Sequence, residues 1–200
     1  MSKLWFKYGA MNCGKTTKLL QEAHNYEERG MKVLIMKPAI DKKAGDKISS
    51  RLGIERKVDI LLDCKDSVKE VLNKLPLKDY SCILVDEAQF LEEEQVFDLF
   101  VITKTKNIPV MCYGLKTDFK TNFFPGSKRL FELADDFERL KTICACGKLA
   151  NFNARKVNGK FVSKGDQVAI DGIDAQYESI CGSCYLKEVL NIDFGGEKDE

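Results

Sequence analysis

The stretch Gly9-Ala10-Met11-Asn12-Cys13-Gly14-Lys15-Thr16 follows a short apolar run and precedes an amphipathic segment. It matches the phosphate-loop pattern G-x-x-x-x-G-K-[ST] in residue type and in its setting between a strand and a helix. In such a loop the backbone N–H groups and the helix N-terminus converge on the β-phosphate, while the lysine reaches the β and γ phosphates. The alternative is a glycine turn that holds Gly-Lys-Thr by coincidence. The stretch predicts that all of its residues contact a nucleoside triphosphate and that the Thr16 hydroxyl binds Mg²⁺.

Apolar runs and amphipathic segments alternate through the first two thirds of the chain. The apolar runs, which predict buried strands, are residues 4–8, 33–36, 83–85 and 110–115. The amphipathic segments, which predict helices, are residues 16–29, 67–74 and 92–103. This alternation predicts right-handed crossovers and a doubly wound α/β core, with a mostly parallel sheet flanked by helices. We expect a nucleotide-binding domain over residues 1–141.

Two consecutive carboxylates, Asp86 and Glu87, follow the third apolar run. The carboxyl end of this strand is expected at the same edge of the sheet as the phosphate loop. We expect Asp86 to hold Mg²⁺ together with Thr16, Glu87 to take a proton from the nucleophile, and residues 86–89 (Asp86, Glu87, Ala88 and Gln89) to contact the nucleotide. A strand that simply ends in solvated acids is the structural alternative. The strand leaves open whether the nucleophile is water, as in an NTPase, or a bound hydroxyl, as in a kinase.

The last part of the chain is bounded by cysteines, in the pairs Cys144/Cys146 and Cys181/Cys184. Four thiolates with no further ligand predict a closed tetrahedral Zn²⁺ site of structural type. Buried free cysteines and an iron–sulfur centre are the alternatives. We expect a small zinc-binding domain over residues 142–194, with strands at 160–162 and 167–170, and a disordered polar tail over residues 195–200.

Composition limits the partners. The 32 basic and 31 acidic residues give a net charge of +1, so an extended basic surface for nucleic acid is not expected. The first residues leave no room for a signal peptide, and no apolar run is long enough to span a bilayer, so we expect no membrane association. The eight cysteines are then expected to be thiols or metal ligands in the cytoplasm.

Several motifs together resemble those of the cytosolic (type II) thymidine kinases. They are the phosphate loop with Met11, the segment Asp86-Glu87-Ala88-Gln89-Phe90, the segment Tyr113-Gly114-Leu115-Lys116-Thr117-Asp118-Phe119, and the cysteine-bounded C-terminal segment. The resemblance covers residues 4–190 and implies a P-loop (RecA-like) α/β fold with a C-terminal zinc-binding lasso domain. It also implies ATP-dependent phosphorylation of the thymidine 5′-hydroxyl, with Glu87 as the general base. A P-loop NTPase and a non-catalytic nucleotide-binding regulator with a zinc module are the rival functions.

The resemblance further implies where thymidine binds. The nucleoside contacts would be Met11, Leu115, Phe119, the lasso residues Val168, Ala169, Ile170 and Asp171, and Tyr177, which closes the site. From the residues alone, plain core packing of Met11, Leu115 and Phe119 is the alternative. Feedback inhibition by dTTP and a homotetrameric assembly are also implied by the resemblance.

The sequence departs from the family pattern at two places. Relatives typically carry Asp-x-Arg near the phosphates, where this chain has Lys43 in the place of the arginine. Lysine keeps the charge but loses bidentate geometry, and Arg51 is an alternative source of the guanidinium. The second departure is the C-x-C spacing of Cys144 and Cys146, in place of the commoner C-x-x-C.

Overall fold

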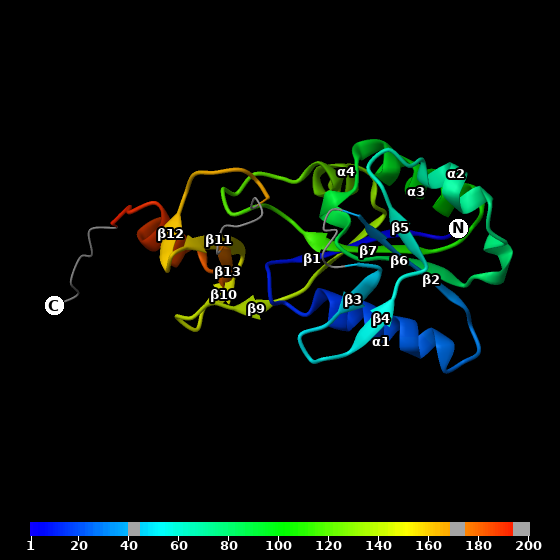
Figure 1. The fold of residues 1–200 in the computed structure, drawn as a ribbon, viewed down its shortest axis with the longest axis horizontal. Helices are drawn as coiled ribbons and strands as arrows, with labels where there is room; N and C mark the ends of the chain where they lie inside the picture. The colour runs from blue at the N-terminus through cyan, green and yellow to red at the C-terminus, as the bar shows by residue number, and fades with distance from the viewer. Residues whose placement is uncertain (40–44, 169–174, 194–200) are drawn as a thin grey trace. The chain divides into compact units, whose positions relative to one another are not determined.

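The central sheet consists of six parallel strands in the order β5-β2-β6-β7-β1-β8 (Figure 1). The structure is a computed structural model that describes residues 1–39, 45–168 and 175–193. The six strands are β1 (Leu4–Gly9), β2 (Val33–Pro38), β5 (Ile60–Leu62), β6 (Cys82–Val85), β7 (Val110–Leu115) and β8 (Asp136–Arg139). Because β7 lies between β6 and β1, the segments that leave the carboxyl ends of these three strands start next to one another.

Helices cover both faces of this sheet. Figure 1 shows α1 (Lys15–Glu27) on one face and α2 (Val68–Asn73), α3 (Glu93–Thr105) and α4 (Pro125–Leu133) on the other. Alternate residues of β2 explain this arrangement, because Val33 and Ile35 pack with α1 while Leu34 and Met36 join the larger core on the opposite side. The doubly covered parallel sheet that the sequence predicts is therefore confirmed.

A buried polar network holds α1 against the sheet. Lys7 on β1 is 6% exposed, and its Nζ lies 2.5 Å from Oε1 of Glu22 on α1 and 3.1 Å from Oε2 of Glu138. The hydroxyl of Tyr113 on β7 donates to the other oxygen of Glu22. Charges that lose water on burial need such partners, so the network fixes one position of α1, the helix that begins at the phosphate loop.

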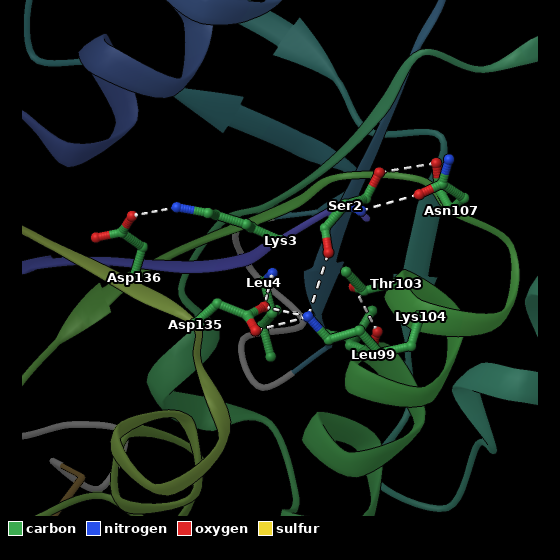
Figure 2. Close-up of polar contacts among 9 residues, drawn as sticks. All are labelled: Ser2, Lys3, Leu4, Leu99, Thr103, Lys104, Asn107, Asp135 and Asp136. Carbon is green, nitrogen blue, oxygen red and sulfur yellow. Dashed lines mark hydrogen bonds and ion pairs between the residues drawn. The ribbon is translucent and has the colours of Figure 1, made fainter.

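Figure 2 shows the polar contacts at the amino ends of β1 and β8. Lys104, near the end of α3, donates from Nζ to both carboxylate oxygens of Asp135 and to the carbonyl of Ser2. The same carboxylate accepts the backbone N–H of Leu4 at 2.7 Å. These bonds tie α3 and the segment before β8 to the first residues of β1.

Contacts divide the chain into two compact units. The first contains Met1–Gly9, Gly14–Lys116 and Phe123–Leu140, and the second contains Ala10–Cys13, Thr117–Asn122 and the chain from Lys141 onwards. The first unit also holds the hairpin of β3 (Lys47–Ser49) and β4 (Glu55–Lys57) and the 3₁₀ turns η1 (Leu77–Asp79) and η2 (Ala88–Phe90). Four residues of the phosphate loop, Ala10–Cys13, therefore belong to the second unit.

The second unit is built from short antiparallel strands. The strands β9 (Thr142–Ile143) and β10 (Leu149–Ala150) form one ladder, and β12 (Lys160–Val162), β11 (Phe152–Val157) and β13 (Ala175–Ile180) form another. The turn α5 (Gly182–Cys184) and the π-helix η3 (Tyr185–Val189) follow. Their core is small and consists of Cys144, Ala150, Ala154, Ile180, Cys181, Tyr185 and Val189.

The structure differs from the sequence expectations in several short elements. The strand at 160–162 is confirmed, but Gln167 and Val168 form a bend rather than a strand, and residues 169–170 lie outside the described ranges. The elements β5, β8, β11, β13 and α4 were not predicted. Among the helices of the described residues, none has both the length and the apolar character needed to cross a membrane.

Candidate active site

The phosphate loop connects the end of β1 to the start of α1. Gly14 caps α1 with φ 79° and Asn12 has φ 62°, so both adopt the left-handed conformation that glycine and asparagine tolerate best. The N–H of Met11 donates to Oδ1 of Asn153 at 2.7 Å, and Nδ2 of Asn153 donates to the carbonyl of Thr117 at 2.8 Å. Asn153 is 3% exposed, so a buried carboxamide that the sequence did not single out fixes the middle of the loop.

Thr16 and Asp86 meet where α1 begins and β6 ends. The Thr16 hydroxyl donates to Oδ2 of Asp86 at 3.0 Å, and the N–H of Glu87 donates to Oδ1 at the same distance. Asp86 is 2% exposed, and burial together with the negative charge of Glu87 raises the pKa of Asp86 to about 7. The buried Asp86 carboxylate and the adjacent Thr16 hydroxyl are oxygen ligands of the kind that Mg²⁺ prefers. The ion would compensate the buried negative charge. These two residues therefore fit the predicted magnesium site.

The backbone of Glu87 turns away from the direction of β6. Its φ of 50° and ψ of 37° place it in the left-handed region, which turns the chain between Asp86 and η2. Nε2 of Gln89 donates to Oε2 of Glu87, while Oε1 of Gln89 accepts the N–H of Leu115 at the end of β7 at 3.0 Å. The structure thus brings Thr16, Asp86, Glu87, Gln89 and Leu115 together at one edge of the sheet.

In the second unit, Arg155 organises the residues around Phe119. The Arg155 guanidinium lies 3.8 Å from the centre of the Phe119 ring, and its Nε donates to the Tyr177 hydroxyl at 2.9 Å. Its other nitrogens donate to the carbonyls of Asp166 at 2.8 Å and Gln167 at 3.0 Å. Arg155 is 5% exposed and Phe119 is 1% exposed. Arg155 is not among the site residues predicted from the sequence, because a single basic residue within the unpredicted strand β11 carries no motif.

The segment that leads into the predicted lasso is held from a second side. Lys120 donates from Nζ to the carbonyl of Gly165 at 2.8 Å, and Nε2 of Gln167 donates to Oδ2 of Asp118 at 3.1 Å. With the bonds from Arg155, the carbonyls of three consecutive residues, 165–167, accept hydrogen bonds from cationic side chains. The start of the lasso segment is therefore fixed by charge-assisted bonds.

The remaining predicted contacts include exposed residues and residues outside the described ranges. Val168 is 46% exposed, and the lasso residues Ala169, Ile170 and Asp171 lie outside the described residues, as does Lys43. Arg51 lies in the exposed turn between β3 and β4.

The sulfur atoms of Cys144, Cys146, Cys181 and Cys184 all lie within 4.8 Å of one another. Sulfurs bound tetrahedrally to zinc at about 2.3 Å would be separated by about 3.8 Å, and Sγ of Cys146 lies 3.6 Å from Sγ of Cys181. Gly147, with φ 84°, closes the turn after Cys146, and a hydrogen bond from the Cys184 N–H lowers the pKa of Cys181 to about 7. Hydrogen bonds with Cys146 and Cys181 raise the pKa of Cys184 instead, so the fit to a metal ion rests on the four thiol donors and their spacing.

Comparison with known proteins places the chain in a family. A family model described as "Thymidine kinase" matches residues 2–185. A thymidine kinase of Idiomarina loihiensis is 48% identical over 96% of this chain and 100% of that protein, and one of Vibrio cholerae is 46% identical over 95% and 99%. A thymidine kinase of Lactococcus lactis is 43% identical over 94% of this chain and 98% of its own length. The chain belongs to the thymidine kinase family.

Proposed function

We propose that this chain transfers the γ-phosphoryl group of ATP to the 5′-hydroxyl of thymidine. The observation that carries this proposal is the arrangement of Glu87, whose carboxylate is fixed one residue beyond the Thr16–Asp86 pair at the phosphate loop. A nucleoside kinase needs a loop that binds the ATP phosphates and, close to it, a group that accepts the proton of the hydroxyl. We assign these two roles to the phosphate loop and to Glu87.

The residues divide the work of transfer between them. Lys15 and the amides of the phosphate loop hold the ATP phosphates. Thr16 and Asp86 would hold Mg²⁺, which would supply positive charge to neutralise the phosphates. Glu87 accepts the proton of the 5′-hydroxyl of thymidine while the 5′-oxygen forms a bond to the γ-phosphorus of ATP. The bond from that phosphorus to the bridging oxygen of ATP breaks, and ADP leaves. Most of the rate enhancement comes from positioning and charge neutralisation.

Thymidine recognition is proposed for the residues that match the family motifs. These are Met11, Leu115, Phe119, Val168, Ala169, Ile170, Asp171 and Tyr177. Support comes from Phe119 and Tyr177, because both contact Arg155, the residue that also fixes the carbonyls of Asp166 and Gln167 just before Val168. An aromatic and aliphatic lining suits the flat thymine ring and its methyl group.

The cysteine cluster is proposed to bind one structural Zn²⁺. All four ligand positions are filled by thiolates, so no position is left for a substrate. The ion would hold the β9–β10 turn against the start of α5, in a unit whose own core is small. Reduced thiols of this kind favour a cytoplasmic location, which we also propose.

Assembly as a homotetramer and feedback inhibition by dTTP are proposals that follow from family membership. Sedimentation of the purified chain and inhibition assays with dTTP test them. Nucleic acid is not proposed as a partner, because the net charge is +1.

A panel of nucleosides tests the proposed function. Purified protein is incubated with ATP, Mg²⁺ and one nucleoside at a time, and the products are separated by chromatography. We expect dTMP and ADP with thymidine, and far less product with purine nucleosides. ADP formed equally without any nucleoside would identify an NTPase, and nucleotide binding without turnover would identify a regulator.

A further inference from the structure

We propose that Gln89 is a positioning residue that acts on phosphoryl transfer by fixing the carboxylate of Glu87. This inference rests on the role of Glu87 proposed above. Gln89 joins two segments at the edge of the sheet, because its amide bonds both to Glu87 and to the end of β7.

The orientation of the Gln89 amide follows from its partners. The backbone N–H of Leu115 can only donate, so the group that faces it must be the amide oxygen. The amide nitrogen therefore faces Glu87 and donates to Oε2. Within the described part of the chain, Oε1 of Glu87 has no hydrogen-bond partner. One oxygen of the carboxylate is thus held while the other is left to accept a proton.

Two glycines allow close packing around η2, the turn that carries Gln89. A Cβ atom at Gly114 would lie 2.9 Å from Oε1 of Gln89 and 3.0 Å from its backbone nitrogen. A Cβ atom at Gly126, in the first turn of α4, would lie 2.6 Å from the carbonyls of Ala88 and Leu91. A side chain at either position would clash, so β7 and α4 pack closely against η2, and β7 lies against the Gln89 amide oxygen.

The burial of Gln89 favours a positioning role over direct contact with the nucleotide. Gln89 is 1% exposed, whereas Glu87 is partly exposed. The amide is committed to protein partners at both its oxygen and its nitrogen, so it acts through Glu87. The left-handed backbone of Glu87 makes such a hydrogen bond useful, because a non-glycine residue in this region is strained and persists only when its surroundings fix it.

A double-mutant cycle tests the inference. The variants are Gln89→Met, Glu87→Gln and the two combined, with kcat, the KM for each substrate and Tm measured for all. Gln95→Met is the matched control. Gln95 is also a buried glutamine, 4% exposed, but it bonds the carbonyls of Asp63 and Asp66 and caps α3, away from Glu87.

We expect Gln89→Met to lower kcat by about 10- to 100-fold, with the KM for ATP changed by no more than about twofold. In the Glu87→Gln background the same substitution should lower kcat by less than about twofold, because the group that it positions is already gone. Gln95→Met should lower Tm and leave kcat unchanged.

Three results would overturn the inference while leaving the proposed function intact: unchanged kcat in Gln89→Met, a rise confined to the KM for ATP, or multiplicative effects in the double variant. Unchanged kcat in Glu87→Gln would instead overturn the role of the base. If Gln89→Met does not fold, Gln89→Glu replaces it, because a carboxylate still accepts the N–H of Leu115 but does not donate to Glu87. The same loss of kcat and the same non-additivity are then expected, and their absence contradicts the inference.

Discussion

Thr16 and Asp86 are 70 residues apart in the sequence, yet the hydroxyl of one donates to the carboxylate of the other at 3.0 Å. The first residue belongs to the first turn of α1 and the second directly follows β6. Asp86 is almost fully buried, so its carboxylate has little access to water, whereas Thr16 is partly exposed. Burial therefore disfavours the charged form of Asp86 and raises the pKa of its carboxyl group.

Replacing Asp86 with asparagine should stabilise the ligand-free protein and inactivate it. Asparagine removes the buried charge, and the Thr16 hydroxyl can accept a hydrogen bond from the new amide. We expect a higher Tm without ligand and a fall in kcat of at least about 100-fold, because charge on the transferred phosphoryl group is no longer neutralised. Thermal unfolding and steady-state assays across a Mg²⁺ titration measure both effects. A lower Tm in the ligand-free variant would contradict the prediction.

The same residue predicts a pH dependence of stability. Burial raises the pKa of Asp86 to about 7 from an ordinary value of 3.8, so the folded state holds this proton more tightly than the unfolded state. The contribution of Asp86 to the free energy of unfolding is therefore highest below the ordinary pKa and falls as pH rises towards 7. Urea titrations at several pH values should show the stability advantage of Asp86→Asn over the native protein growing between these limits. An advantage that is constant with pH would show that Asp86 is not protonated in the folded protein.

Zinc binding gives a prediction for Cys181. The Cys181→Ser variant should lose one metal ion per chain by elemental analysis, and hydrogen exchange should speed up in residues 141–193 more than in the sheet. Cys64→Ser is the matched control, because Cys64 is exposed and lies outside the cluster. Native protein that contains no metal and keeps full activity would end the proposal of a structural zinc.

Replacing Arg155 should raise the KM for thymidine more than the KM for ATP. Arg155→Met removes the bonds to the carbonyls of Asp166 and Gln167, and a hydrogen bond to a charged group contributes about 1.5–3 kcal/mol. We expect the KM for thymidine to rise by about 10- to 100-fold, with a much smaller change in the KM for ATP. Lys156→Met is the control, because the adjacent Lys156 pairs with Glu178 near the surface instead. Equal increases for both substrates would show that Arg155 serves general stability.

The sequence predicted the parts of the fold and site that depend on local pattern. Gly9 to Thr16 and the pair Asp86/Glu87 could be placed because the apolar runs 4–8 and 83–85 end directly before them. Parallel strands then put both at one edge of the sheet without further information. The four cysteines could be grouped because they occur as two closely spaced pairs, and thiolates in such pairs are typical zinc ligands.

What the sequence could not supply are contacts between distant, ordinary residues. Nothing near Asn153 indicates that its amide bonds Met11 and Thr117, which lie 142 and 36 residues away. The brace between Gln89 and Leu115 depends on the packing of η2 against Gly114 and Gly126, which is a tertiary property. Short edge strands such as β5 and β8 also escaped, because three or four residues carry too little periodicity.

The destination of the γ-phosphate distinguishes phosphorylation of thymidine from hydrolysis of ATP. ATP labelled at the γ-phosphate is incubated with Mg²⁺ and either the native protein or Glu87→Gln, with and without thymidine, and labelled dTMP and free phosphate are quantified. We predict one dTMP for each ADP with native protein, little ADP without thymidine, and a kcat that is lower by about two to four orders of magnitude in Glu87→Gln with nucleotide binding retained. Label released into water at the same rate without thymidine, or an unchanged kcat in Glu87→Gln, would contradict the account.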